Sequence, residues 1–567
     1  MKFALIGLNA RYTHSCLALF YVRNELQRHF SEKNIDIKQF TINDPYYELV
    51  LQLSSLEADY YCFSASIWNS DLIVRLVDDL LRIDPGIFCI VGGPQAERVG
   101  KASGNRRCIA VCGAIERVDP QFYRDLEKRA LKETYSANRH CREFSFPYVE
   151  ADFRNHLRDR HIYYETSRGC PFSCTYCLSS AQQGVYQKEM DEIKKELTFI
   201  LNWNPAVVRF VDRTFNADTQ KTLAIWRFLA EQRSETVFHF EMSPDRFTEE
   251  MFTFLAQLPA GRFQFEIGIQ STHQKTLAAI RRQVDTEKAS RAIQRLSRMG
   301  NIHLHVDLIL GLPFETKSSF LLSFRDVFSM EPQYIQMGLL KILPNTHIFH
   351  CAEEYGYCYS STPPYSVLAS KWMDHRTLRE MFWFSECVEK FLNTRYFVSL
   401  WGYFRSIAVD IVVFFHELVE VCYRNSFFQR APTQDLLCAM ILECVEKRDD
   451  RFHILELLRY DWMRCGHRFL PERLTLSSEM NSAAIKKKLF RRLENVETCG
   501  CEGDKEKMFF LKKGFFLEFS SECLEKLGYE IHCDRHYLCF VPERDNGIFR
   551  FCRAALFSLR EIEPGEK

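Results

Sequence analysis

The chain has 567 residues, of which 46% are hydrophobic and 14% aromatic, so it is long enough to bury two or three hydrophobic cores. Its 74 basic side chains balance 74 acidic ones, which excludes a strong nonspecific attraction to nucleic acid. The 22 cysteines are scattered through a long chain without a secretion signal. We therefore expect reduced thiols in a cytoplasmic protein, and no apolar stretch is long enough to predict a membrane anchor.

The first 120 residues alternate short apolar runs with amphipathic stretches, a pattern typical of a parallel sheet covered by helices. The sequence predicts strands over residues 2–8, 35–40, 60–63 and 88–91. In doubly wound, Rossmann-like sheets, ligands bind beyond the carboxyl ends of the strands. We therefore expect a cofactor at the loops that follow these strands. Residues 121–160 are charged and are interpreted as a linker.

Three cysteines, Cys170, Cys174 and Cys177, follow the linker at C-x-x-x-C-x-x-C spacing. Gly169 and Pro171 interrupt regular structure there, so that the thiolates can converge on one point. Three thiolates can hold three irons of a 4Fe-4S cluster and leave the fourth iron open for a substrate or cofactor. Thiolates also suit zinc, but the second C-x-x-C that a structural zinc site would need is not found nearby.

With an aromatic residue, Tyr176, just before the third cysteine, this motif resembles the signature of the radical S-adenosylmethionine (radical SAM) superfamily. The resemblance implies that the open iron binds the amino and carboxylate groups of S-adenosylmethionine. It also implies that one electron from the cluster cleaves this cofactor to a 5′-deoxyadenosyl radical.

Residues 161–350 repeat the strand and helix alternation, which suits a partial, TIM-like (β/α) radical SAM barrel with working residues at its strand ends. Several strand ends carry ionic or polar groups and resemble the places where the family binds the ribose, methionine and adenine of its cofactor. The alternative that some of them form buried structural pairs, such as Asp212 with Arg213 or Arg209, stays open. The resemblance implies these S-adenosylmethionine-binding residues: Tyr176, Asp212, Glu241, Glu266, Gln270, Arg282 and Asp307.

The first domain, directly upstream of the cluster motif, resembles the cobalamin-binding domain of cobalamin-dependent radical SAM enzymes. The resemblance rests on a Gly-Gly-Pro loop after the fourth strand and a serine-rich loop after the third. The D-x-H-x-x-G motif is absent, which implies a cobalt with no histidine beneath it. The family's G-E-G-E-like loop is replaced by residues 112–116, a departure that weakens the expectation of a corrin. The implied cobalamin contacts are Asn9, Ser64, Ser66, Trp68, Gly92, Gly93, Pro94 and Gly113.

Residues 351–567 change composition to long, aromatic-rich helical stretches, which we interpret as core. Short strands are expected near the end, over residues 508–511, 515–519 and 536–541. This C-terminal domain carries no pattern that indicates a ligand class, and the family resemblance assigns it no role.

Two enzymatic functions and one nonenzymatic function fit the sequence. The favoured one is cobalamin-dependent methylation of an unactivated carbon. The first alternative is a radical SAM lyase or rearrangement enzyme with a vestigial cobalamin domain, for instance one that cuts a side chain from a modified nucleobase in salvage. The second, less favoured, is a noncatalytic cobalamin or iron-sulfur sensor. We expect a small-molecule or modified-nucleobase substrate and a reducing partner such as flavodoxin or ferredoxin, and the sequence identifies no general base.

Overall fold

A computed structural model describes residues 1–30, 35–137, 144–181, 184–476, 480–531, 535–542 and 552–559. The chain divides into two compact units. The first comprises residues 1–323, 330–332 and 337–378, and the second comprises residues 324–329, 333–336 and 379–567. None of the helices within the described ranges combines the length and the apolar character needed to cross a membrane.

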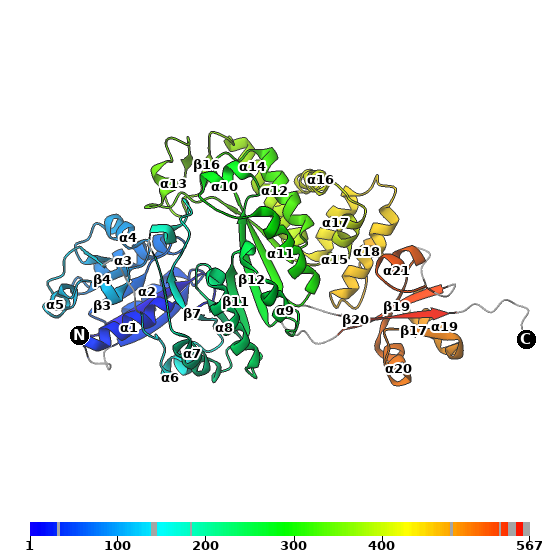
Figure 1. Cartoon of the computed structure of the whole chain (residues 1–567), viewed down its shortest axis with the longest axis horizontal. Helices are drawn as coiled ribbons and strands as arrows, with labels where there is room; N and C mark the ends of the chain where they lie inside the picture. Colours follow the sequence, from blue (N-terminus) through cyan, green and yellow to red (C-terminus); the bar gives the residue numbers. More distant parts are fainter. Residues whose placement is uncertain are drawn as a thin grey trace, which may run out of the picture. The chain divides into compact units, whose positions relative to one another are not determined.

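The first unit begins with a six-stranded parallel sheet of order β2-β1-β3-β4-β5-β6, flanked by helices (Figure 1). The strand order reverses between β1 and β3, which makes their carboxyl ends the switch point where doubly wound sheets bind ligands. Its elements are β1 (Phe3–Asn9), α1 (Leu17–His29), β2 (Ile35–Thr41), α2 (Tyr46–Ser54), β3 (Tyr60–Ser64), α3 (Ser70–Ile83), β4 (Phe88–Gly92), α4 (Ala96–Ser103), β5 (Cys108–Cys112), α5 (Gln121–Glu127) and β6 (Thr134–Ser136).

This sheet forms because its central strands are continuous apolar runs. Every residue of β1 is buried, as expected for a parallel strand covered on both faces. Helix α3 buries a stripe that includes Ile73, Leu76 and Leu80 at helical spacing. The expected α/β class is confirmed here, and β6 extends the sheet into the segment interpreted as a linker, because it pairs with β5.

A second six-stranded sheet has the order β14-β13-β12-β11-β10-β7, with helices between its strands. Six strands are fewer than the eight of a closed TIM barrel, in agreement with the expected partial barrel. Its elements are β7 (Ile162–Tyr164), α7 (Met190–Leu201), β10 (Val207–Phe210), α8 (Thr219–Glu231), β11 (Val237–Met242), α9 (Glu249–Leu255), β12 (Phe263–Gln270), α10 (Gln274–Ala279), α11 (Thr286–Met299), β13 (His303–Leu310), α12 (Lys317–Ser329) and β14 (Tyr334–Leu339).

The second unit is mainly helical and ends in an antiparallel sheet of order β17-β20-β19-β18. Its main elements are α15 (Val398–Ser406), α16 (Ile411–Arg424), α17 (Gln434–Cys444), α18 (Arg451–Arg464), α19 (Ser482–Arg491), β17 (Val496–Cys499), α20 (Asp504–Lys513), β18 (Phe515–Glu518), α21 (Ser521–Lys526), β19 (Arg535–Pro542) and β20 (Cys552–Leu559).

The strand expected over residues 508–511 is wrong, because this segment lies within helix α20. Its apolar run buries only Phe510 and Leu511, and charged residues surround it. Asp504 and Glu506 lie in the first turn and Lys512 and Lys513 in the last, a distribution that favours a helix through its macrodipole. The other two expected strands correspond to β18 and β19.

Candidate active site

The cysteine motif lies between the two strands of an antiparallel pair, β8 (Ser167–Gly169) and β9 (Val185–Gln187), just after β7. Gly169 has a φ of +98°, and a Cβ at this position would lie 2.1 Å from the carbonyl oxygen of Gly184. Only glycine permits this close approach of the two backbones. The loop is further held by Thr175, whose N–H donates to Ile280 O at 3.1 Å and whose carbonyl accepts from Ile348 N at 2.9 Å.

The three thiols of this loop lie close enough to influence one another. Cys174 is buried, whereas Cys170 and Cys177 are half-buried. Burial raises the pKa of the Cys170 thiol, and the charges of Cys177 and Cys174 act in the same direction. Three thiols on one loop whose charges influence one another are the donor set that an iron-sulfur cluster uses. The residues present therefore fit the cluster that the motif predicts.

Arg282 connects this loop to the barrel sheet. Its Nη1 donates to Cys174 Sγ at 3.8 Å, and its Nη2 donates to the carbonyl oxygen of Gly268 in β12. The buried Nε has no hydrogen-bond partner within the described ranges. A guanidinium N–H is thus left for an anionic group beside the cluster, which fits the S-adenosylmethionine-binding role that the resemblance implies for Arg282. Tyr176 lies in the same place, because its hydroxyl interacts with both Arg282 and Cys174.

Strands β10 to β13 carry charged side chains on one face of the second sheet. Along β12 and β13, buried apolar residues alternate with half-buried ones, so the charged positions share one face. Glu241 pairs with Glu266 in the register of β11 and β12, and Asp307 lies opposite Gly268. These predicted cofactor-binding side chains are therefore brought together. Gln270 ends β12 with a φ of +73°.

The carboxyl groups on this face differ in their proton affinities. Burial raises the pKa of Glu241 to about 7. Burial also raises the pKa of Asp307 well above its usual range, with Glu266 and Glu241 acting in the same direction. Glu266 is different, because its hydrogen bond with His239, at 3.2 Å, lowers its pKa. The face can thus offer both a carboxylate and protonated carboxyl groups near neutral pH.

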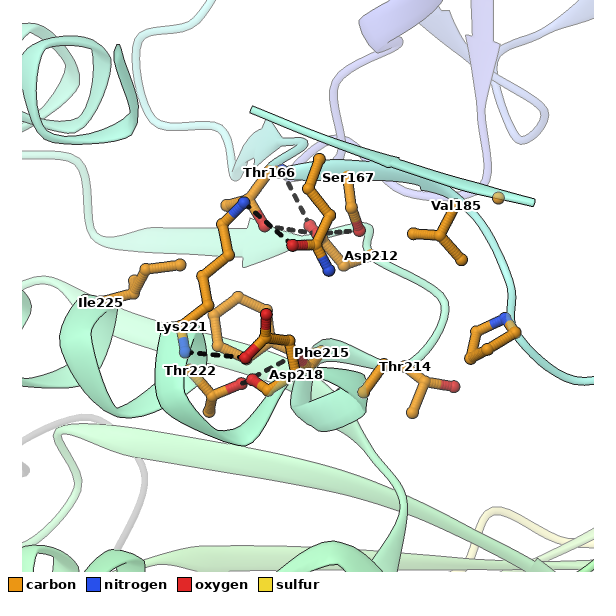
Figure 2. A pocket seen from close by; sticks show the side chains of 14 residues that line it. Thr166, Ser167, Val185, Asp212, Thr214, Phe215, Asp218, Lys221, Thr222 and Ile225 are labelled. Carbon is orange, nitrogen blue, oxygen red and sulfur yellow. Dashed lines mark hydrogen bonds between the residues drawn. The ribbon is translucent and has the colours of Figure 1, made fainter. Parts of the chain in front are cut away.

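Asp212 holds the start of the cluster loop. Its carboxylate is 1% exposed and accepts hydrogen bonds from Thr166 N at 3.0 Å, Thr166 Oγ1 at 2.5 Å and Ser167 Oγ at 2.6 Å (Figure 2). A small polar pocket lies here between the β8–β9 pair and the start of α8, and Lys221 reaches across it to the Lys188 carbonyl. Asp212 therefore stabilises the start of the cluster loop through these hydrogen bonds. Its contact with S-adenosylmethionine stays a prediction.

The expected cobalamin residues gather at the carboxyl-end loops of β1, β3, β4 and β5. Gly93 has a φ of +91°, and a Cβ there would lie 2.5 Å from the Ala65 carbonyl oxygen, so the β3 and β4 loops meet closely.

Two aromatic side chains of these loops are exposed. Trp68 is 56% exposed, and Tyr12, in the loop after β1, is 60% exposed. Both rings follow strands whose carboxyl ends form the switch point, where a doubly wound sheet binds a large cofactor such as a corrin. The Asn9 side chain donates to Gln39 Oε1 at 3.3 Å, and the backbone carbonyl of Ser64 accepts from Asn69 Nδ2 at 3.0 Å.

The loop after β5, which departs from the family pattern, is tied to the cluster strand. Arg168, directly before Gly169, forms ion pairs with Glu116 and Glu165, each at 2.9 Å. Glu165 also accepts a hydrogen bond from Tyr21 of α1 at 2.7 Å. The first sheet and the cluster loop are therefore joined by a network of largely buried charges.

Sequence reasoning missed several residues of this region. Arg209 was considered only as a structural partner, but it lies 3.1 Å from His239 Nε2 and 3.7 Å from Glu266 on the charged face. The alternation of apolar and polar residues along the strands was the available signal for Arg209 and His239. Arg168 gave no such signal, because its partner Glu116 is 52 residues away in the sequence.

Comparisons with known proteins agree with this arrangement. Residues 164–327 match the radical SAM superfamily, and residues 353–508 match a protein family of unknown function, DUF4080. Residues of this chain are 23% identical over 191 positions to an uncharacterized methyltransferase of Pyrococcus horikoshii, covering 33% of this chain and 41% of that protein. They are 32% identical over 167 positions to the cobalamin-dependent radical SAM methyltransferase TokK of Streptomyces tokunonensis, covering 28% and 24%.

The chain thus spans about two fifths of the length of the first of these relatives and about a quarter of the second. Among solved structures, it is similar to the cobalamin-dependent S-adenosylmethionine radical enzyme OxsB with aqua-cobalamin bound. The TM-score is 0.55 at 13% identity, with 87% of this chain and 80% of that chain covered. At this identity the likeness supports the fold. Residues 164–327 of this chain therefore form a radical SAM domain, followed by a DUF4080 region.

Proposed function

We propose that this protein is a cobalamin-dependent radical SAM methyltransferase that methylates an unactivated carbon. The observation that carries the proposal is the placement, within one compact unit, of the three-cysteine loop and a switch-point rim of glycines and exposed rings. The similarity to methyltransferases such as TokK supports the same reaction class.

When bound, a 4Fe-4S cluster would supply the electron that cleaves S-adenosylmethionine, and cobalamin would carry the methyl group. Cys170, Cys174 and Cys177 would hold the cluster, and Arg282 would orient the cofactor's carboxylate beside it. The charged face of β10 to β13 would bind the remaining polar groups of that cofactor, with Glu266 ionised and Asp307 protonated.

The rim after β1, β3 and β4 would hold the corrin, with Trp68 and Tyr12 in contact with its apolar surface. The ion pairs of Arg168 with Glu116 and Glu165 would hold this rim at a fixed position relative to the cluster loop. A small-molecule or modified-nucleobase substrate and a flavodoxin or ferredoxin as electron donor remain part of this proposal.

An anaerobic reconstitution tests it. The full chain is incubated with iron, sulfide and hydroxocobalamin, desalted, and characterised by its absorbance spectrum. We expect corrin bands together with iron-sulfur absorbance, and formation of both S-adenosylhomocysteine and 5′-deoxyadenosine on turnover. Cys174→Ala should lose the cluster and keep the corrin, whereas Trp68→Ala should keep the cluster and retain less corrin.

A cluster without retained corrin would overturn the methylation reaction. The lyase or rearrangement reaction would then take its place, and one feature favours it: Glu116, in the loop that departs from the cobalamin pattern, is engaged with Arg168. 5′-Deoxyadenosine without S-adenosylhomocysteine would be the matching product result.

A further inference from the structure

The second unit contains a buried group of three metal-ligating side chains, far from the cysteine loop in the sequence. His453, Glu456 and Cys523 each offer one ligand atom, and these atoms all lie within 4.8 Å of one another. The three residues are 7%, 2% and 0% exposed, respectively. Imidazole nitrogen, carboxylate oxygen and thiolate sulfur are the three donor types that zinc accepts in proteins.

The helices bring these donors together. His453 and Glu456 are three residues apart on α18, so they share one helix face. Cys523 lies in the first turn of α21, which is capped by Ser520. Ser520 also donates from its backbone N–H to Glu456 Oε1 at 2.6 Å and from its hydroxyl to Oε2 at 2.5 Å. These bonds fix the orientation of the carboxylate, as outer partners of metal ligands do, and each oxygen keeps a second lone pair.

His453 provides an independent indication of a ligand. Both of its ring nitrogens are buried, and neither has a hydrogen-bond partner within the described ranges. The ring packs beside Tyr403, with centroids 4.4 Å apart. A buried imidazole normally satisfies its nitrogens, and a metal ion would satisfy the nitrogen to which it binds.

We propose that His453, Glu456 and Cys523 bind one zinc ion that fastens α21, and the sheet next to it in sequence, to α18. On binding, Zn²⁺ takes the place of the thiol proton of Cys523, and that proton passes to solvent. The charges then balance, because the ion faces one carboxylate, one thiolate and a neutral imidazole. A water molecule completes the tetrahedron as the fourth ligand.

Zinc analysis and zinc K-edge X-ray absorption on the full chain, reconstituted with its iron-sulfur cluster, test this assignment. We expect about one zinc ion per chain after desalting, with one sulfur at about 2.3 Å and the other ligands at about 2.0–2.2 Å. Zinc that has entered an empty cluster site would show three sulfur ligands instead. Zinc with three sulfurs, zinc with no sulfur, or no retained zinc would each overturn the proposal.

Variants make the test specific to these residues. Cys523→Ser and His453→Gln should each reduce bound zinc at least about tenfold, because each removes one ligand. Cys438→Ser is the matched control, since this thiol is also fully buried in the second unit but lies on α17. Cys174→Ala should retain zinc while it loses iron. Wild-type levels of zinc in Cys523→Ser would overturn the proposal, and the wild-type absorption spectrum decides the matter if that variant does not fold.

Discussion

The Glu241 carboxyl group lowers the free energy of unfolding at high pH. Burial raises its pKa in the folded chain to about 7, from the usual value of 4.5. An acid with a raised folded-state pKa favours folding at low pH and loses that contribution as the pH rises from its unfolded pKa towards its folded one. We therefore expect Glu241→Gln to stabilise the cofactor-free protein above about pH 7, by up to about 3 kcal/mol, and to have little effect below about pH 4.

Urea titrations of both proteins over this pH range would measure the difference in free energy of unfolding. Glu231→Gln, an exposed glutamate at the end of α8, is the control and should change stability by less than about 0.5 kcal/mol at any pH. A Glu241→Gln effect that is the same at low and high pH would contradict a raised pKa of Glu241 in the folded chain.

Arg282 is expected to tune the cluster's reduction potential. Its guanidinium lies 3.8 Å from Cys174 Sγ, where a positive charge stabilises the more negative, reduced cluster. Loss of roughly 1 kcal/mol of this interaction in Arg282→Gln corresponds to a potential about 43 mV more negative. Redox titration followed by electron paramagnetic resonance measures this shift.

Two variants separate charge from other effects of the substitution at Arg282. Arg282→Lys retains the charge and should keep most of the potential. Arg281→Gln removes an adjacent charge whose guanidinium contacts His347 instead, so it should leave the potential near the wild-type value. Equal potentials in Arg282→Gln and wild type would contradict the assigned role.

At the scale of elements, the β5 loop and the cluster strand should be energetically coupled through Arg168. Arg168→Gln leaves Glu116 and Glu165 without their cationic partner at side-chain exposures of 9% and 15%. We expect a loss of roughly 1–3 kcal/mol in the stability of the first unit, because largely buried charges lose their compensation. Denaturant titration gives the value, and Arg154→Gln, from an exposed ion pair, should cost less than about 0.5 kcal/mol.

A double-mutant cycle with Glu116→Gln tests the coupling directly. The two substitutions share one ion pair, so their effects should fall short of additivity by about 1 kcal/mol. Additive effects would mean that the loop and the cluster strand are held by other contacts.

Elements with a strong apolar pattern could be predicted from the sequence, whereas partners distant in the sequence could not. The central strands of the first sheet follow from continuous apolar runs, and strands β12 and β13 of the second follow from apolar residues at alternate positions. The cluster loop follows from the cysteine spacing. Asp212 could be placed at a strand end, but its bonds to Thr166 and Ser167 depend on how β7 and β10 pair. The group of His453 and Cys523 spans 70 residues without a motif, so only the packing of α18 and α21 brings it together.

At the scale of the whole molecule, the two compact units should respond separately to ligands. Each has its own core, one around the first sheet and one around the final sheet. A ligand that binds only the folded first unit stabilises that unit by about 2.7 kcal/mol at a free concentration of about 100 times its Kd. Hydroxocobalamin should therefore slow hydrogen exchange in peptides of β1, β3 and β4 and leave peptides of α16 to α18 unchanged. Mass spectrometry measures the exchange of the peptides from both units. The Trp68→Ala variant is expected to lose the protection of β1, β3 and β4.

Protection confined to the second unit, or equal protection in Trp68→Ala, would show that the corrin does not bind at the β1 and β3 switch point.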